Sequence, residues 1–96
     1  MKKSYELTFI VQIDANEDAM QATVDQVKAW VEAEDNGQVI KIDRWGRRRL
    51  AYEIDGQREG FYVLFEANIE PDHIPEIERD LKLSSEVLRY LIIRPD

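Results

Sequence analysis

Residues 39–67, VIKIDRWGRRRLAYEIDGQREGFYVLFEA, lie at the centre of a 96-residue chain and decide how it folds. Val39 to Asp43 is rich in branched apolar residues and predicts a strand, which Leu50 to Ile54 continues. Trp45-Gly46 interrupts that strand and predicts a kink or bulge. The first half of the stretch therefore predicts one long, irregular strand.

The second half of the stretch predicts a partner for that strand. Asp55-Gly56 and Gly60 supply turn residues before Phe61 to Ala67, an aromatic-rich run. We therefore expect the two strands to pair as a hairpin.

A helix is predicted before the hairpin. Asn16 is suited to cap its start, and Asn36-Gly37 ends it. The apolar residues between them recur at helical spacing and form one stripe: Met20, Val24, Val27 and Val31.

A second helix is predicted after the hairpin. Pro71 and Asp72 open it, Pro75 is tolerated because it falls in the first turn, and the helix should end near Leu83. Its apolar stripe is narrow: Ile74, Ile77 and Leu81.

The outermost segments of the chain read as strands. Ser4 to Gln12 alternates between apolar and polar side chains, and Val87 to Arg94 is the last apolar run. The order βαββαβ predicts an α+β fold with a four-stranded antiparallel sheet and both helices on one face. At this length we expect a single domain, residues 1–96.

The face of the sheet away from the helices should be partly apolar. Ile10, one of Tyr62 or Leu64, and one of Leu91 or Ile93 cannot all sit beneath the helices. Contiguous exposed apolar residues often mark a binding surface, although branched and aromatic residues also favour strands for their own sake.

Charge is distributed unevenly over this acidic chain, whose net charge is −7. Residues 14–35 carry seven acids against one lysine and residues 66–86 carry seven against two basic residues, so the remainder is net positive. Arg44 and Arg47 to Arg49 fall close together with no acid between them. Such a basic edge suits phosphate, because a guanidinium can engage two oxygens at once.

Two considerations temper the interpretation of these arginines. They can instead pair with Glu53, Asp55 or acids of the first helix. Successive strand residues also point to opposite faces, so only a bulge could bring more than two of the arginines together.

Catalysis and cofactor binding find little support in the sequence. His73 is the only histidine, cysteine is absent, and we expect His73 to be a surface residue. Asp14, Glu17 and Asp18 lack the spacing of a calcium loop and suit a helix N-terminus instead. We therefore predict no enzyme activity, catalytic residue, metal, cofactor or small-molecule substrate. Without a long apolar run we also expect no membrane association and a soluble cytoplasmic protein.

Four motifs along the chain resemble the bacterial small-subunit ribosomal protein S-six family. They are Tyr5-Glu6, Trp45-Gly46-Arg47-Arg48-Arg49-Leu50-Ala51-Tyr52-Glu53-Ile54, Gly60-Phe61-Tyr62, and Val87-Leu88-Arg89-Tyr90-Leu91 with Arg94. The resemblance implies a ferredoxin-like sandwich that binds the central domain of small-subunit (16S) rRNA as a heterodimer with the S-eighteen protein. It also implies a place in the cytoplasmic ribosome.

Together the resemblance and the charge pattern give two sets of candidate residues. The RNA-binding set is Lys2, Lys3, Arg44, Arg47, Arg48, Arg49, Arg89 and Arg94. The partner-binding set is Trp45, Tyr52 and Tyr62. The alternative is an ACT-like regulatory module that binds a small molecule, which shares the topology but gives no reason for the arginine cluster.

Overall fold

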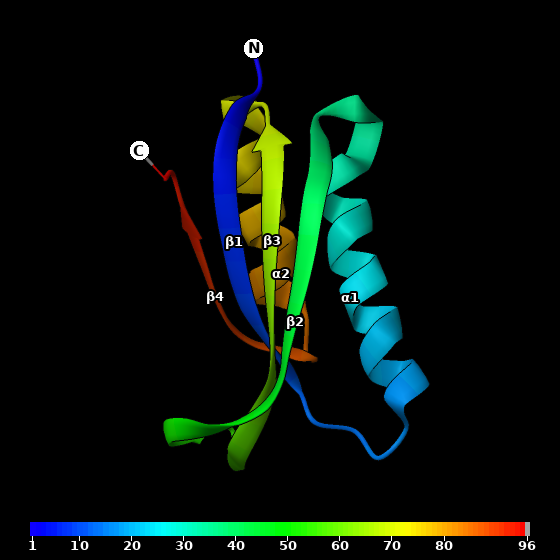
Figure 1. Cartoon of the computed structure of the whole chain (residues 1–96), viewed down its shortest axis with the longest axis vertical. Helices are drawn as coiled ribbons and strands as arrows, with labels where there is room; N and C mark the ends of the chain where they lie inside the picture. Colours follow the sequence, from blue (N-terminus) through cyan, green and yellow to red (C-terminus); the bar gives the residue numbers. More distant parts are fainter. Residues whose placement is uncertain (96) are drawn as a thin grey trace.

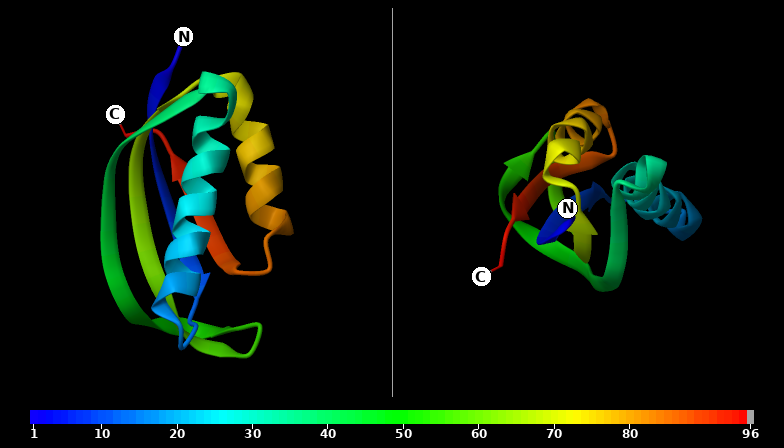
Figure 2. Two further views of the ribbon diagram at one scale, coloured as in Figure 1. Left: turned by 90° about the vertical axis from the view of Figure 1, so that its right-hand side faces the viewer. Right: turned by 90° about the horizontal axis from the view of Figure 1, so that it is seen from above.

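Two helices lie against one face of a four-stranded antiparallel sheet in the computed structural model, which describes residues 1–95 (Figures 1 and 2). The elements in chain order are β1 (Lys3–Gln12), α1 (Glu17–Glu32), the 3₁₀ turn η1 (Ala33–Asp35), β2 (Gly37–Ile54), β3 (Gln57–Ile69), the 3₁₀ turn η2 (Pro71–His73), α2 (Ile74–Leu83) and β4 (Val87–Ile93). The strands are arranged β2-β3-β1-β4, so β2 and β4 are the edges. The predicted α+β, ferredoxin-like architecture is confirmed. No helix of residues 1–95 is long and apolar enough to cross a membrane.

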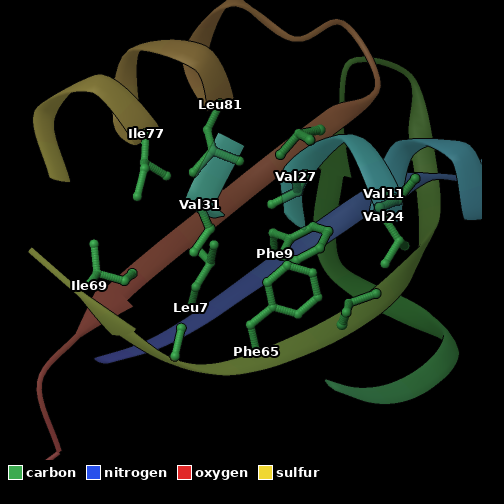
Figure 3. Close-up of a cluster of buried hydrophobic side chains, with 13 residues drawn as sticks. Leu7, Phe9, Val11, Val24, Val27, Val31, Phe65, Ile69, Ile77 and Leu81 are labelled. Carbon is green, nitrogen blue, oxygen red and sulfur yellow. The ribbon is translucent and has the colours of Figure 1, made fainter. Parts of the chain in front are cut away.

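The core lies between the sheet and the two helices (Figure 3). Every second residue of β1 and β3 points into it, because side chains alternate along a strand. Phe9 and Phe65 meet there edge to face, with ring centroids 5.0 Å apart. The predicted helical stripes supply the other side of the core, including Val24, Val27 and Val31 of α1 and Ile77 and Leu81 of α2.

The first helix begins and ends close to the predicted residues. The Asn16 side chain accepts a hydrogen bond from the Asp18 N–H at 2.9 Å, which confirms the predicted cap. The helix ends at Glu32, and η1 carries the chain to Gly37, the first residue of β2. A side chain at Gly37 would collide with the carbonyl of Val31, so glycine is required by this close approach.

The second helix ends at Leu83 and holds Pro75 in its first turn, as predicted. The prediction for His73 was wrong, because this side chain is buried and only 5% exposed. Its Nε2 lies 2.9 Å from the Trp30 carbonyl oxygen, so Nε2–H donates to α1. Its Nδ1 lies 3.4 Å from Glu76 Oε2. The histidine therefore joins the two helices.

The hairpin of β2 and β3 confirms the predicted bulge. Trp45 has no partner on β3, since the register shifts between Arg44 and Gly46, and Gly46 has a φ of 85°. At the other end, Asp55 and Gly56 both have positive φ, 48° and 78°. This is the combination that a two-residue type I′ turn requires.

Gly60 was expected to belong to the turn, and this was wrong. The strand β3 begins already at Gln57, and Gly60 lies within it opposite Arg48 of β2 and Gln12 of β1. Two-residue loops pair the strands immediately, which is why the ladder extends so close to the turn.

The face of the sheet away from the helices, called the open face below, is more apolar than predicted. Tyr62 and Leu64 share it, because residues two apart on a strand point the same way, and Leu91 and Ile93 share it for the same reason. The expectation of one residue from each pair was therefore too low. Leu91 and Ile93 are 59% and 45% exposed.

Candidate nucleic-acid and partner interface

The arginines of β2 are all exposed, on an edge strand. Arg44, Arg47 and Arg49 pair with Val63, Phe61 and Glu59 of β3 and by register share the side of the sheet that faces the helices. Arg48 pairs with Gly60 and points to the open face. The bulge at Trp45 shifts the register by one residue and thereby brings three arginines to one side of the sheet. On a regular strand, alternation would have allowed only two.

Few acidic side chains form ion pairs with these arginines. Arg47 Nη1 lies 3.6 Å from Glu59 Oε1, and Arg44 Nε donates to the neutral side chain of Gln21 at 3.2 Å. Among residues 1–95, no ion pair involves Arg44, Arg48 or Arg49. Glu53, which we considered a partner, contacts Arg58 instead at 3.5 Å. An exposed pair such as Arg47–Glu59 is weak, so the cluster keeps its positive charge.

Three arginines lie over aromatic rings, a feature that the sequence analysis missed. Arg48 lies 5.6 Å from the centre of the Trp45 ring. Arg89 lies 5.1 Å from the Tyr52 ring, and Arg94 lies 5.9 Å from the Tyr5 ring. Only the first pair is close in sequence, where an arginine three residues after a tryptophan could have suggested it. Each ring restricts its guanidinium and leaves the donor edges accessible.

Lys2 and Lys3 are exposed at the start of β1, far along the sheet from the bulge. The Met1 ammonium donates to Glu70 Oε1 at 2.7 Å. This hydrogen bond lowers the pKa of Glu70, and the charge of Lys2 contributes a smaller part. An acid thus already lies in the neighbourhood of Lys2.

The candidate partner residues border the open face. Trp45 is 47% exposed, Tyr52 is 59% exposed, and Tyr62 is half-buried. Charged side chains accompany them: Lys41 lies 3.7 Å from Asp43 and 3.9 Å from Glu66. An apolar centre with a polar rim is the usual composition of a protein interface.

Acids dominate the helices on the opposite side. Asp14, Glu17 and Asp18 lie at the start of α1, where Asp14 accepts a hydrogen bond from the Asn16 N–H at 2.8 Å. The helix α2 adds Glu76, Glu78 and Asp80 against Arg79 and Lys82. The arginines of β2 are exposed at the sheet edge and not buried beneath this acidic layer.

Fold and surface together define an α+β ferredoxin-like domain with an arginine-bearing edge strand and a partly apolar open face. The model of the family described as ribosomal protein S6 matches residues 4–94, and the chain belongs to this family. The small ribosomal subunit protein bS6 of Desulfitobacterium hafniense is 39% identical over 94 residues, 98% of each chain. That of Moorella thermoacetica is 40% identical over 92 residues, 96% of this chain and 93% of the relative.

A solved structure agrees with these sequence comparisons. The crystal structure of 30S ribosomal protein S6 from Thermotoga maritima matches with a TM-score of 0.90 and 27% identity, over 99% of this chain and 89% of that one. The family is one of structural proteins of the bacterial ribosome, which is cytoplasmic, and nothing in it indicates catalysis. Membership in this family decides against the ACT-like alternative.

Proposed function

We propose that this chain binds the central domain of small-subunit rRNA as a heterodimer with the S-eighteen ribosomal protein. The observation that carries the proposal is the set of exposed arginines on β2, of which only Arg47 has an acidic partner within residues 1–95. Family membership supports a place in the small subunit.

The two surfaces have different binding partners. The arginine edge contacts RNA phosphates, and the open face binds the partner protein through Leu91, Ile93 and the aromatic residues beside them. RNA approaches the β2 edge of the sheet and not the helices, because the acidic helices repel phosphate. The chain as a whole carries a charge of −7, so the partner supplies much of the attraction for RNA.

A filter-binding titration with a central-domain rRNA fragment tests this proposal. The isolated protein should bind weakly, and addition of the S-eighteen protein should strengthen the complex. Equal affinity with and without that protein would contradict the proposed heterodimer. No binding in either case would contradict the RNA function altogether.

Two exposed leucines on opposite sides of the molecule provide a matched test of the open face. Leu91 on β4 is 59% exposed and Leu83 at the end of α2 is 77% exposed. We expect Leu91→Ala to weaken the heterodimer by about 1 kcal/mol or more, because it removes apolar contact area, whereas Leu83→Ala should leave it unchanged. Isothermal titration calorimetry measures both; equal effects would mean that the partner does not use the open face.

A further inference from the structure

A gap in the open face lies at Gly60. A Cβ atom there would collide with Cγ2 of Ile10 and would lie 3.5 Å from Cδ2 of Leu50. The absence of a side chain lets Leu50 of β2 and Ile10 of β1 approach each other across β3. Leu50 is consequently only 8% exposed, although Arg49 and Ala51 beside it are exposed.

The contact continues towards the other edge of the sheet. Arg89 of β4 pairs with Ile10, and its guanidinium lies 5.1 Å from the centre of the Tyr52 ring on β2. The strands β2 and β4 are the two edges, with β3 and β1 between them. Leu50 therefore lies where β3 has no side chain, and Tyr52 of the same strand reaches Arg89 on the opposite edge.

The end of the hairpin, residues 47–58, is called the arm here. Figure 1 shows it bending out of the line of the strands to the side of β4, away from α1. The arm carries Arg47 to Arg49 as well as Leu50, which lies beside Gly60, and Tyr52, which contacts Arg89. The position of three arginines is thus coupled to a contact with β4.

We propose that Gly60 is a positioning residue that seats the arm against β4, so that Arg48 and Arg89 act as one RNA-binding surface on the open face. This inference rests on the RNA binding proposed above. Arg89 is far from Arg48 in sequence, and the contact of Tyr52 with Arg89 brings the arm that carries Arg48 to β4. Neither Arg48 nor Arg89 has an ion-pair partner within the described residues.

The chemistry of the contact explains why positioning matters. A guanidinium stacked on a ring keeps its N–H donors at the edge, where they can engage two phosphate oxygens. An arm already seated in this arrangement loses less conformational entropy on binding than one that must be ordered by the RNA. Gly60 contributes no charge and no donor, so its effect on affinity must come from the arm.

The experiment uses a substitution and its rescue. Gly60→Ala introduces the collision with Ile10, and Ile10→Ala removes the colliding Cγ2 atom. NMR of the free protein reports the contact, because the Tyr52 ring shifts the resonances of the Arg89 side chain. The second measurement is the affinity of each heterodimer for the central-domain rRNA fragment.

We expect Gly60→Ala to abolish the ring-induced shift of Arg89 and to weaken RNA binding by about two- to fivefold, the range of an exposed cation–π contact. The double variant Gly60→Ala/Ile10→Ala should recover both, relative to Ile10→Ala alone. Tyr52→Leu tests the contact without a backbone change and should behave like Gly60→Ala, whereas Tyr52→Phe should behave like the unchanged protein.

Each other outcome overturns the inference in a recognisable way. If the unchanged protein shows no ring-induced shift on Arg89, the arm is not seated on β4. If the shift is lost in Gly60→Ala and Tyr52→Leu while RNA affinity stays the same, the positioning role is wrong and the proposed function stands. If the unchanged heterodimer does not bind RNA at all, the proposed function fails.

Discussion

The hydrogen bond from His73 to the Trp30 carbonyl is the clearest example of a single residue that organises this fold. Trp30 lies in the last turn of α1, where the final carbonyls have no partner within the helix, and that turn has no basic residue. The His73 Nε2–H satisfies one of them at 2.9 Å, from a position forty-three residues further along the chain. The ring also fills the space between the helices.

We predict that His73→Ala lowers the free energy of unfolding by about 2–3 kcal/mol, since it leaves the part-buried Trp30 carbonyl without this donor and opens a cavity. His73→Gln, which retains an N–H donor, should cost less. Urea unfolding monitored by circular dichroism measures both. Glu76→Gln is the control, because it changes the exposed partner of His73 Nδ1 and leaves the hydrogen bond to Trp30 intact. If Glu76→Gln cost as much stability as His73→Ala, the contribution of His73 would not come from the hydrogen bond to Trp30.

Trp45 is a second residue whose contribution to stability can be predicted from its surroundings. Its ring is 47% exposed, lies beside Arg48 and has no strand partner. We expect Trp45→Ala to lower the free energy of unfolding by only about 1 kcal/mol. This is well below the cost for a buried tryptophan, because about half of the side chain is already exposed to water. Thermal melts would show this, and a loss of about 3 kcal/mol or more would mean that the bulge depends on the ring.

Single residues also mark the limit of prediction from sequence. Tyr62 and Leu64 could have been placed correctly, because the period of a strand puts both on one face. The burial of His73 could not have been predicted, since nothing in the neighbouring sequence reveals that Trp30 lies beside it. Gly60 looked like a turn residue, and only its neighbours on β1 and β2 show why glycine is needed there.

At the scale of elements, periodicity and capping residues predicted what the structure shows. The cap at Asn16, the bulge at Trp45 and the end of α2 at Leu83 are all local features, and all three were predictable. The long, interrupted strand β2 was predicted as well, but the strand conformation of residues 47–49 was not. Its arginine-rich middle shows no alternation, and pairing with β3 is what keeps residues 47–49 in the strand.

The turn between β2 and β3 allows a test at this scale. Gly56 has a φ of 78° and nothing lies within 4 Å of the position of a Cβ atom, so Gly56→Ala introduces backbone strain without a collision. We predict a loss of about 1 kcal/mol in the free energy of unfolding. Asp55→Asn is the matched control, because asparagine tolerates positive φ, and it should be nearly neutral. Equal losses in chemical unfolding would contradict the type I′ assignment.

At the scale of the whole molecule, charge is sorted by layer. The two helices carry seven acids against three basic residues, while exposed arginines line the β2 edge and Arg89 lies on the open face. The segregation of charge along the sequence predicted this much. It could not predict which arginines are paired, because the partner of Arg47 is Glu59 on the neighbouring strand, and Arg89 meets Tyr52 only through the curvature of the arm.

The sorted charge leads to a prediction about how the assembled complex responds to salt. Phosphate contacts release counterions, so each lost contact lowers the dependence of log affinity on log salt by about one unit. We expect Arg48→Ala and Arg49→Ala each to weaken RNA binding by the reconstituted heterodimer by about 1–2 kcal/mol and to reduce the slope accordingly. The effect should be similar for different RNA sequences, since the site offers charge on a strand and no base-reading helix.

Arg79 provides the control for this prediction, because it is an exposed arginine on α2 among the acids of the helix layer. Arg79→Ala should leave both the affinity and the salt slope unchanged, while all three variants keep the fold, as thermal melts would show. A salt series from low to moderate ionic strength on each heterodimer separates the two sides of the molecule. If the slope fell for Arg79→Ala and stayed constant for Arg48→Ala, Arg49→Ala and the double variant, RNA would be held on the helix side, against the electrostatics of the whole chain.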